Sequence, residues 1–487
     1  MGSTFGGYNI AYSGMRVSQS ALTVTSNNLS NVNTDGYSRQ RIANEENVIN
    51  LSGQTTVGTG VTVEEVRRAR NQLLDNTYHK QNATASYWST KSGMVDYMQQ
   101  ILDEFGASDG SGSDGLQQVI QDFFDGWEEL STDSGDQTNR QAILEYAATL
   151  IDTFQSMDDA LAALQQDAYN SASDIVTEIN DIASQIATLN LQVVKDEAVS
   201  GEASDLRDQR DALLDELSNY TNFSTQEQEN GSVSVFIAGI ALVSLDKTSK
   251  LSLEGEGTEA SPASVQWVDM NEAAKITSGT LKACLEDADQ DGVSTPITDF
   301  TASATSSVTN LRQSLNYTLT TLVTKVNSLL TSGIDLNGDA GTAMFVVVDS
   351  TKSLSLTNIK VNEELTNDLN KIATGTTGEA SDNSIAAKIC DLCDEDLLSY
   401  NGLSQDIFNF YQSTVSWVGT VGSDTSDYYS TYTTLATQAD NQRQSISSTS
   451  LDEEMSNMIM FQNAYSASAR VLSTMDGLIA DMIEELG

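Results

Sequence analysis

Hydrophobic positions recur with the period of an α-helix along most of the chain, and the longest such pattern lies in its first half. Fifteen apolar residues from Ile143 to Val193 follow one another in steps of three and four, with one additional step of four between Ala168 and Ala172. This heptad pattern with a single stutter predicts one helix over about 138–194, roughly 80 Å long at a rise of about 1.5 Å per residue. A helix of that length does not fit a compact ball and predicts a rod.

Shorter helical patterns lie on both sides of this long one. They cover 94–105, 116–130, 308–329 and 403–421, and a linker rich in Gly, Ser and Asp separates the first two over 106–115. The two prolines of the chain, Pro262 and Pro296, both lie in the middle third. Because proline interrupts helices, their absence elsewhere favours long helices in the rest of the sequence.

The middle of the chain has a different pattern, with short β-branched runs between Gly, Asp and Asn turns. These runs predict strands within 232–245, 250–253, 264–268, 343–348 and 353–361. Because their turns bound them on both sides, we expect the strands to form a core of their own. The fold class predicted is therefore mainly α: a long rod-like helical bundle formed by the N- and C-terminal arms, with an inserted β-rich domain.

Each end of the chain carries an apolar stripe of heptad spacing that has no partner nearby in the sequence. The N-terminal stripe consists of Tyr8, Met15, Leu22 and Leu29. The C-terminal stripe consists of Leu451, Met458, Tyr465, Leu472, Ile479 and Leu486, and Met455, Ala469 and Ile483 begin a second row. Ser450 and Glu453 have the spacing of a capping box that starts the C-terminal helix. A heptad seam needs a second helix, so each end is expected to pair with the other or with a neighbouring subunit.

Three domains follow from these patterns. Residues 1–45 and 445–487 are expected to form a terminal coiled-coil domain. Residues 46–221 and 381–444 are expected to form a helical rod domain. Residues 222–380 are expected to form the β-rich inserted outer domain, at the far end of the rod.

Charge is distributed unevenly along the 487 residues, whose formal net charge is −45. This acidity argues against nucleic acid and anionic membranes as partners, because their phosphates would be repelled. The first 38 residues, in contrast, hold only two charged side chains, Arg16 and Asp35. A segment with so little charge is expected to be covered by another surface.

No run of 18 apolar residues occurs, so we expect no membrane insertion. The N-terminus also lacks a basic segment followed by an apolar one, so no conventional secretory signal is expected. Taken alone, these two observations indicate a cytoplasmic protein.

The residues that could carry chemistry are sparse. Cys390 and Cys393 form a lone C-x-x-C within a helical pattern, for which we expect an apolar packing role. The single histidine, His79, is expected to be exposed, and Arg207 and Asp211 are expected to pair on a helix surface.

One acidic turn has the beginning of a calcium-binding loop. Asp287, Asp289 and Asp291 have the spacing of its first half, but Thr298 stands where the loop needs Glu, and Pro296 falls inside it. We therefore expect an acidic surface turn. No phosphate loop, Gly-x-Ser-x-Gly or histidine cluster is present, so the sequence predicts no enzyme activity, cofactor or metal site.

Two terminal segments carry a family resemblance. "SGMRVSQSALTVTSNNLSNVNTDGYSRQR" (13–41) resembles the N-terminal signature of the bacterial flagellar rod, hook and hook-associated proteins. "LDEEMSNMIMFQNAYSASARVLSTMDGLIADMI" (451–483) resembles their C-terminal signature. Interior segments over 123–150, 206–220, 232–243 and 326–345 resemble, more specifically, the hook-associated protein 1 family of this group.

The resemblance implies a structural protein of the hook–filament junction that assembles through its terminal helices. It implies as partners copies of the chain in a ring, the hook protein, the second junction protein and an export chaperone at the C-terminal helix. It also implies export through the flagellar channel on an uncleaved signal, which replaces the cytoplasmic interpretation with an extracellular location. At Gly36, where a turn needs a permissive residue, the chain is expected to leave the inner helix.

Other functions stay open at this point. A flagellar hook protein or a flagellin-like axial subunit fits the terminal signatures alone. An acidic surface adhesin is a more distant alternative, and a hydrolase has no motif to support it.

Overall fold

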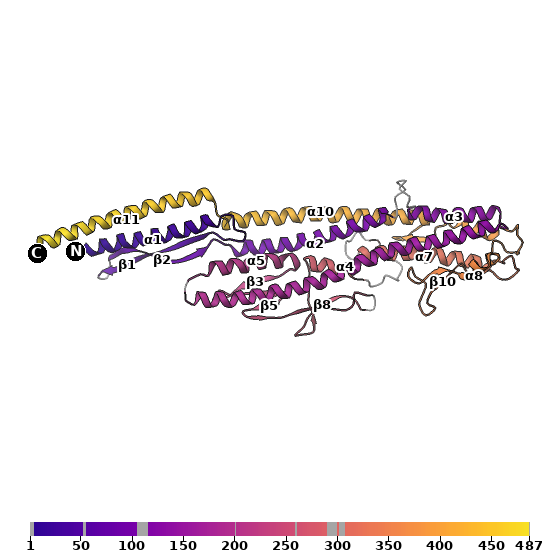
Figure 1. Ribbon diagram of the computed structural model, residues 1–487, viewed down its shortest axis with the longest axis horizontal. Coiled ribbons are helices and arrows are strands. Elements are labelled where there is room, and N and C mark those ends of the chain that lie inside the picture. The colour runs from indigo at the N-terminus through magenta and orange to yellow at the C-terminus, as the bar shows by residue number, and fades with distance from the viewer. Residues whose placement is uncertain are drawn as a thin grey trace.

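The computed structural model describes residues 4–51, 55–104, 115–199, 201–258, 261–289, 300 and 307–486. The molecule is an elongated rod, and both termini lie at the same end of it (Figure 1). The fold is mainly α with a β-containing middle region, as the sequence predicts. Among the described residues no helix is both long and apolar enough to cross a membrane.

The elements alternate between long helices and short strands. The helices are α1 (Thr4–Ser30), α2 (Gln72–Glu104), α3 (Leu116–Thr132), α4 (Gln137–Glu197), α5 (Ser204–Tyr220), α6 (Thr280–Asp287), α7 (Ser307–Ser332), α8 (Glu363–Asn367), the 3-10 helix η1 (Leu369–Lys371), α9 (Ser384–Asp391), α10 (Ile407–Ser447) and α11 (Leu451–Leu486). The strands are β1 (Gln40–Leu51), β2 (Thr55–Arg68), β3 (Ser224–Glu227), β4 (Val233–Ile237), β5 (Ile240–Ser244), β6 (Lys247–Thr248), β7 (Leu251–Glu254), β8 (Ser264–Trp267), β9 (Glu272–Ala273), β10 (Phe345–Val346), β11 (Lys360–Val361), β12 (Leu398–Tyr400) and β13 (Leu403–Gln405).

Helix α4 is the longest of the described helices and confirms the long helix predicted from the heptad pattern. Asp136 caps its start, because the carboxylate accepts a hydrogen bond of 2.8 Å from the Thr138 amide. The predicted seam is buried along nearly its whole length. Since the helix is 61 residues long, α4 contributes to both hydrophobic cores of the molecule.

The two cores follow one another along α4. The first contains the N-terminal half of α4 with α2, α3, α7, α9 and α10. The second contains the C-terminal half of α4 with α5, α6 and strands β4, β5, β7 and β8. Each core is therefore built from segments far apart in the sequence.

The middle region does not have the separate core that its turns predict. Its strands form a four-stranded sheet in the order β3-β4-β5-β6 and a three-stranded sheet in the order β7-β8-β9. Buried residues of both sheets pack with α4 in the second core, and the sheets lie beside the rod near its middle (Figure 1). Helix α7, also within 222–380, has its apolar face fully buried in the first core. The expectation of an independent unit at the far end of the rod is therefore wrong.

The strand boundaries also need correction. The apolar run over 232–245 is a hairpin, because Ala238 and Gly239 turn with φ of 49° and 90° between β4 and β5. The runs over 343–348 and 353–361 contain only the two-residue strands β10 and β11. Leu403, expected in a helix, lies in β13, because Asp406 caps α10 and starts it at Ile407.

A long hairpin that the sequence analysis missed follows α1. Strands β1 and β2 pair antiparallel from Gln40 with Arg68 to Leu51 with Thr55, with register shifts after Ala43 and Asn47. Polar residues occupy both faces of these strands, so the alternation that marks a half-buried strand is weak. A Cβ on Gly60 would overlap the Ser13 hydroxyl of α1, so this glycine permits the hairpin to lie close to the helix.

Candidate assembly site

The first and last helices of the chain pack against each other, antiparallel, to form one end of the rod (Figure 1). A Cβ on Gly7 would overlap the end of Met475, and a Cβ on Gly14 would lie 3.2 Å from Ser468 Oγ. Seven residues forward on α1 thus correspond to seven residues back on α11. The structure therefore pairs the two terminal helices, whose apolar stripes had no partner nearby in the sequence.

The closest residues of α1 are small ones, in the row next to the predicted stripe. Residues spaced by three and four along α1 are buried or lie against α11: Gly7, Ala11, Gly14, Ser18, Ala21, Thr25 and Asn28. The large residues of the predicted stripe are half-buried: Tyr8, Met15, Leu22 and Leu29. Small side chains permit a close approach of two helices, so they are buried while the larger neighbours remain partly accessible.

Helix α11 buries only part of its apolar surface. Met458, Tyr465, Leu472 and Ile479 of the predicted seam are half-buried. Leu451, Met455 and Ile483 are 47%, 49% and 67% exposed. More apolar side chains of the helix are exposed outside the predicted rows: Ile459, Met460, Val471, Leu478 and Met482. The helix therefore presents apolar surface well beyond what its pairing with α1 covers.

A groove of about 450 Å³ lies between α1, α11 and β1. Apolar side chains from all three elements line it: Val17, Ala21, Val24, Ile42, Met460, Phe461 and Ala464. Arg41 lies in the groove and is exposed. The groove and the exposed apolar side chains of α11 together form a surface that we call the terminal surface.

Asn28, near the end of α1, uses its whole side-chain amide to fix the chain that follows. Its Nδ2 donates to the Gln40 carbonyl at 2.9 Å and to Glu454 Oε2 at 3.1 Å. Its Oδ1 accepts from the Tyr37 hydroxyl at 2.8 Å and from the Gln40 amide at 2.9 Å. Since Asn28 is 1% exposed, this polar stretch ends α1 by satisfying buried backbone groups rather than by exposing them to water.

Arg39 connects the same stretch to the start of α11. Its guanidinium lies 2.8 Å from Glu453 and 2.5 Å from Glu454, and its amide donates to the Ser447 carbonyl at 2.9 Å. The arginine is 5% exposed and Glu454 is 2% exposed. The hydrogen bond that Arg39 donates to Glu453 raises the pKa of Arg39, so the arginine stays charged.

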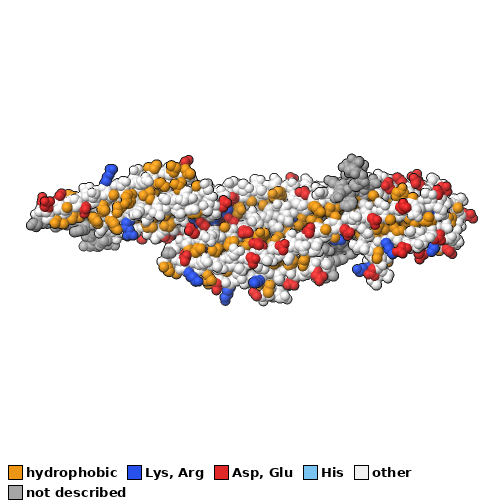
Figure 2. All heavy atoms as spheres, in the orientation of Figure 1, with side chains coloured by type: hydrophobic (Ala, Val, Ile, Leu, Met, Phe, Trp, Pro, Cys, Tyr) orange, Lys and Arg blue, Asp and Glu red, His pale blue; other side chains and the backbone are white. Residues whose placement is uncertain are grey.

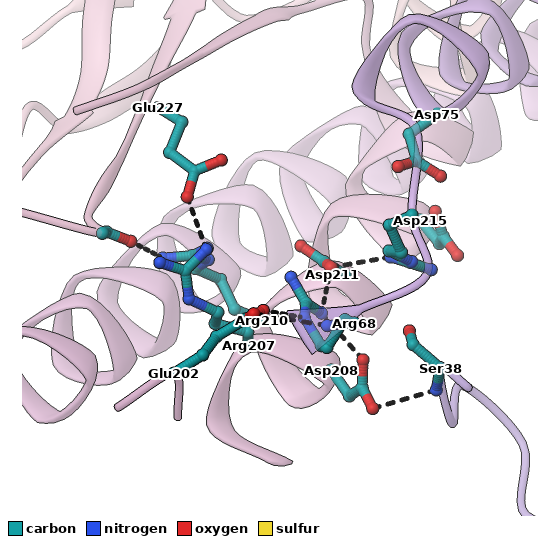
Figure 3. A network of polar contacts seen from close by, with 12 residues as sticks. Ser38, Arg68, Asp75, Glu202, Arg207, Asp208, Arg210, Asp211, Asp215 and Glu227 are labelled. Carbon is teal, nitrogen blue, oxygen red and sulfur yellow. Dashed lines mark hydrogen bonds and ion pairs between the residues drawn. The ribbon is translucent and has the colours of Figure 1, made fainter. Parts of the chain in front are cut away.

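A second set of ion pairs connects the hairpin to the rod through α5, and we call it the joint: Ser38, Arg68, Arg70, Glu202, Asp208 and Asp211. Arg68 lies 2.7 Å from both Asp208 and Asp211 and 3.1 Å from Glu202, and Arg70 lies 2.7 Å from Asp211. Figure 3 shows Arg68 between the two aspartates, with the Ser38 amide donating to Asp208 at 2.9 Å. The joint therefore fixes the hairpin, and through Ser38 the segment that follows α1, to α5 of the rod.

The pKa values of the two aspartates of the joint are shifted in opposite directions. Burial raises the pKa of Asp211, but Arg68 and Arg70 outweigh burial and the net pKa lies below its ordinary value. Burial raises the pKa of Asp208 above its ordinary value, although Ser38 and Arg68 act against it. Burial, together with Asp208, raises the pKa of Tyr37 to about 12. Asp211 is thus the carboxylate whose charge the joint stabilises.

Two expectations about side chains beside the joint are wrong. His79 is 6% exposed rather than accessible, and its Nε2 lies 2.7 Å from Asp215, which also pairs with Arg443 of α10 at 2.7 Å. Arg207 does not pair with Asp211 but with Glu197 and Glu227, at 2.6 and 2.5 Å. In both cases the side chain pairs with a carboxylate on another helix or strand instead of facing solvent or pairing within its own helix.

The remaining sequence candidates lie elsewhere. Gly36 has φ of +78° in the turn after α1, as its permissive role requires. Asp287 is fully buried and lies 2.9 Å from Lys91, so the expected surface turn is wrong at this residue; Asp291 lies outside the described residues. The described residues hold no cluster of potential metal ligands.

Cys390 and Cys393 are half-buried free thiols at the edge of the first core, and burial raises the pKa of each to about 11.

Comparison with known proteins identifies the family. The model of the flagellar hook-associated protein FlgK helical domain matches residues 98–345, half of the chain. The chain belongs to this family. The family models for the flagellar basal body rod protein and for the C-terminal region of the flagellar basal body rod FlgEFG proteins match 9–37 and 437–485, within the two ends of the chain.

Relatives of the FlgK family match the chain over its full length. Flagellar hook-associated protein 1 of Bacillus subtilis is 27% identical and aligns with 100% of this chain and 99% of its own. Its namesake in Escherichia coli is 25% identical, with 98% of both chains covered. The solved structure of the flagellar hook junction protein FlgK from Burkholderia pseudomallei has a TM-score of 0.61 at 14% identity, covering 77% of this chain and 100% of that chain. The last comparison supports the fold.

Proposed function

We propose that this protein is a structural, non-enzymatic subunit of the bacterial flagellum that forms the junction between hook and filament. The observation that carries the proposal is the terminal surface, which is built from the two ends of the chain and leaves apolar side chains of α11 exposed. Membership of the FlgK family gives this surface its context, since relatives over the whole chain are hook-associated proteins. The surface would be covered on assembly by neighbouring subunits.

The proposed assembly interface retains the residues identified from the sequence: Tyr8, Met15, Leu22, Leu29, Gly36, Leu451, Met455, Met458, Tyr465, Leu472, Ile479 and Ile483. The half-buried members stabilise the α1–α11 pair, and the exposed members contact neighbours. The partners proposed are copies of the chain in a ring, the flagellar hook protein, the second junction protein and an export chaperone at α11.

The proposed location is extracellular, at the tip of the hook, after export through the flagellar channel. The domain division also stays a proposal: a terminal domain of 1–45 and 445–487, a helical rod of 46–221 and 381–444, and the middle region 222–380, which packs into both cores of the rod. The joint holds the first of these on the second, so that neighbours contacting the terminal surface also position the rod.

Deletion of the gene and electron microscopy of the cells test the proposal. The expected result is hooks that lack filaments, and the wild-type chain should restore the filaments. Immunogold labelling of isolated flagella should place the protein between hook and filament. Loss of the hook itself would indicate a hook protein, and labelling along the filament would indicate a flagellin-like subunit; either result overturns the proposal.

A further inference from the structure

Lys91, in the second half of α2, is a lysine that lies inside the protein. Lysine and arginine side chains usually lie at the surface with their charged groups in water, as the blue side chains in Figure 2 do. Lys91 is 0% exposed, and its amine faces the last two residues of α6, Glu286 and Asp287. The fold therefore places one amine beside two carboxyl groups in its interior.

The amine is within reach of both carboxyl groups. Lys91 Nζ lies 2.9 Å from Asp287 Oδ2 and 3.2 Å from Glu286 Oε2. The Tyr87 hydroxyl donates to the same Glu286 oxygen at 2.7 Å, and Lys282 Nζ lies 3.1 Å from the other one. Glu286 is thus held by three neighbours. Asp287 is held less well, because neither of its oxygens accepts an aligned hydrogen bond from the part of the chain that the structure describes.

The two carboxyl groups differ in the protonation state that the site favours. Burial raises the pKa of Asp287, and the nearby Lys91 offsets this only in part. Burial also raises the pKa of Glu286, but its neighbours, Lys91 first among them, outweigh burial, and the net pKa lies below the ordinary value. The site therefore favours Asp287 as the neutral acid and Glu286 as the carboxylate. An amine can attack a neutral acid, and a carboxylate can take a proton from an amine.

We propose that Lys91 and Asp287 form an amide bond between their side chains, which links α2 covalently to α6. Glu286 takes one proton from the Lys91 ammonium, and the free amine attacks Cγ of Asp287, so that the N–C bond forms. Glu286 then donates that proton to the hydroxyl group of Asp287, which leaves as water when the C–O bond breaks, and takes up the second proton of the amine. The proton left on Glu286 goes to solvent, to which this side chain is 11% exposed.

Enclosure of the site favours this condensation. The amine and the acid are already in contact, so no encounter of two separate molecules is needed. Because Lys91 and Asp287 are both 0% exposed, water has little access to hydrolyse the product. The amide also carries no charge, so it replaces a buried acid that lacks an aligned hydrogen bond.

The bond would join two helices that are distant in sequence and that both pack on α4. It closes a loop of about 200 residues, and a covalent link across a long loop stabilises a fold by restricting its unfolded chain. The inference goes beyond the proposed function and does not depend on it, because the reaction needs only the folded chain.

Mass spectrometry of the purified full-length chain tests the inference. The mass of the denatured chain should lie below the mass of its sequence by one water molecule. Trypsin should fail to cleave after Lys91, and the digest should contain residues 81–140 joined to residues 283–312. A chain of full sequence mass that trypsin cleaves after Lys91 would overturn the inference, and so would loss of water without the joined peptides.

Three variants assign the roles within the site. Lys91→Arg keeps the positive charge but removes the amine, and Glu286→Gln keeps the shape of the side chain but cannot take the proton. Both variants should have their full sequence mass and no joined peptides. Lys282→Ala removes the other lysine beside Glu286 and should keep the bond. A bond in Lys91→Arg, or its loss in Lys282→Ala, would contradict the assignment. The wild-type chain decides whether the bond exists, even where a variant folds poorly.

Discussion

At the scale of single residues, the joint shows how a few charges connect parts of the chain that are far apart in sequence. Arg68 is the last residue of the hairpin, and its partners Asp208 and Asp211 lie about 140 residues later on α5. Arg68 is 8% exposed at its side chain, so its charge depends on those partners. Loss of one of these carboxylates would leave the buried guanidinium of Arg68 with one ion pair fewer and little water to replace it.

Asp211→Asn should therefore loosen the terminal domain from the rod. The free energy of unfolding should fall by about 2 kcal/mol, because Arg68 and Arg70 each lose an ion pair. Urea unfolding followed by tryptophan fluorescence measures the change. Asp205→Asn, an exposed carboxylate on the same helix, is the control and should be neutral. A neutral result for both variants would show that the joint does not stabilise the fold.

The depressed pKa of Asp211 also predicts a pH dependence. Its contribution is present above the ordinary carboxyl pKa of about 4 and is lost as the pH falls through the lower pKa of the folded state. The difference in unfolding free energy between wild type and Asp211→Asn should therefore shrink when urea unfolding is repeated at about pH 3 instead of about pH 6. A constant difference would argue that Asp211 acts through packing and not through its charge.

At the scale of elements, the pairing of α1 with α11 depends on small residues along one row of α1. Gly14 lies close enough to Ser468 that a larger side chain must displace α11, whereas Gly6 has open space around it. The exposed side of α11 does not contribute to this pairing, because it does not contact α1.

Gly14→Leu should separate the two terminal helices while leaving the rod folded. Trypsin should then cleave at Arg16 and Arg470 faster than in wild type, and the melting temperature of the rod should change little. Gly6→Leu adds the same side chain at an open position and should be cleaved at the wild-type rate. Equally fast cleavage of wild type and both variants would indicate that the ends are already loose in the free subunit.

Leu472→Asp should leave the rod folded and stop incorporation at the hook. The residue lies half-buried in the middle of α11, where an unpaired carboxylate costs on the order of 2–3 kcal/mol. Secreted and hook-bound protein would be measured separately, because reduced secretion would instead indicate loss of chaperone binding. Ser473→Asp, one residue along and exposed, should assemble normally. Wild-type filaments on the Leu472→Asp strain would contradict the role of this seam.

At the scale of the whole molecule, the rod is continuous because α4 passes through both cores. The middle region contributes α7 to the first core and two sheets to the second. In the sequence the middle region lies between the helical segments, but in the structure its residues belong to the two cores of the rod. Helices α1 and α11, in contrast, contribute none of their described residues to either core; α1 packs on the hairpin, which the joint fixes to α5.

Replacing 222–380 with a flexible linker should consequently abolish folding of the rod, whereas deleting 1–30 should spare it. The first change removes fully buried residues of α7 from the core, which include Leu311, Leu319 and Leu330. The second removes only α1, whose partners are α11 and the hairpin. Thermal unfolding followed by circular dichroism distinguishes the two. A cooperative wild-type transition after the replacement would mean that the middle region is dispensable for the rod.

The sequence by itself determined three of the helices, because their periodicity is local, but the patterns over 94–105 and 403–421 mark only parts of α2 and α10, which span Gln72–Glu104 and Ile407–Ser447. Helix α4 was predicted within about three residues at each end, and the helices α3 and α7 within two or three. The two apolar ends and the family resemblance could also be recognised from the sequence alone, since both depend on residues close together in the chain. Weak alternation hid the hairpin β1–β2, and a turn at Ala238–Gly239 was concealed within an apolar run.

Only the tertiary structure decided which surfaces meet. It selected the small residues of α1 as the contact row, because close packing favours small side chains that no hydrophobicity pattern reveals. It paired Arg39 with Glu454, Arg68 with Asp211 and His79 with Asp215, each across more than 130 residues. It also placed α7 in the rod. Contacts between distant segments depend on how whole helices pack, and that information is absent from any single stretch of sequence.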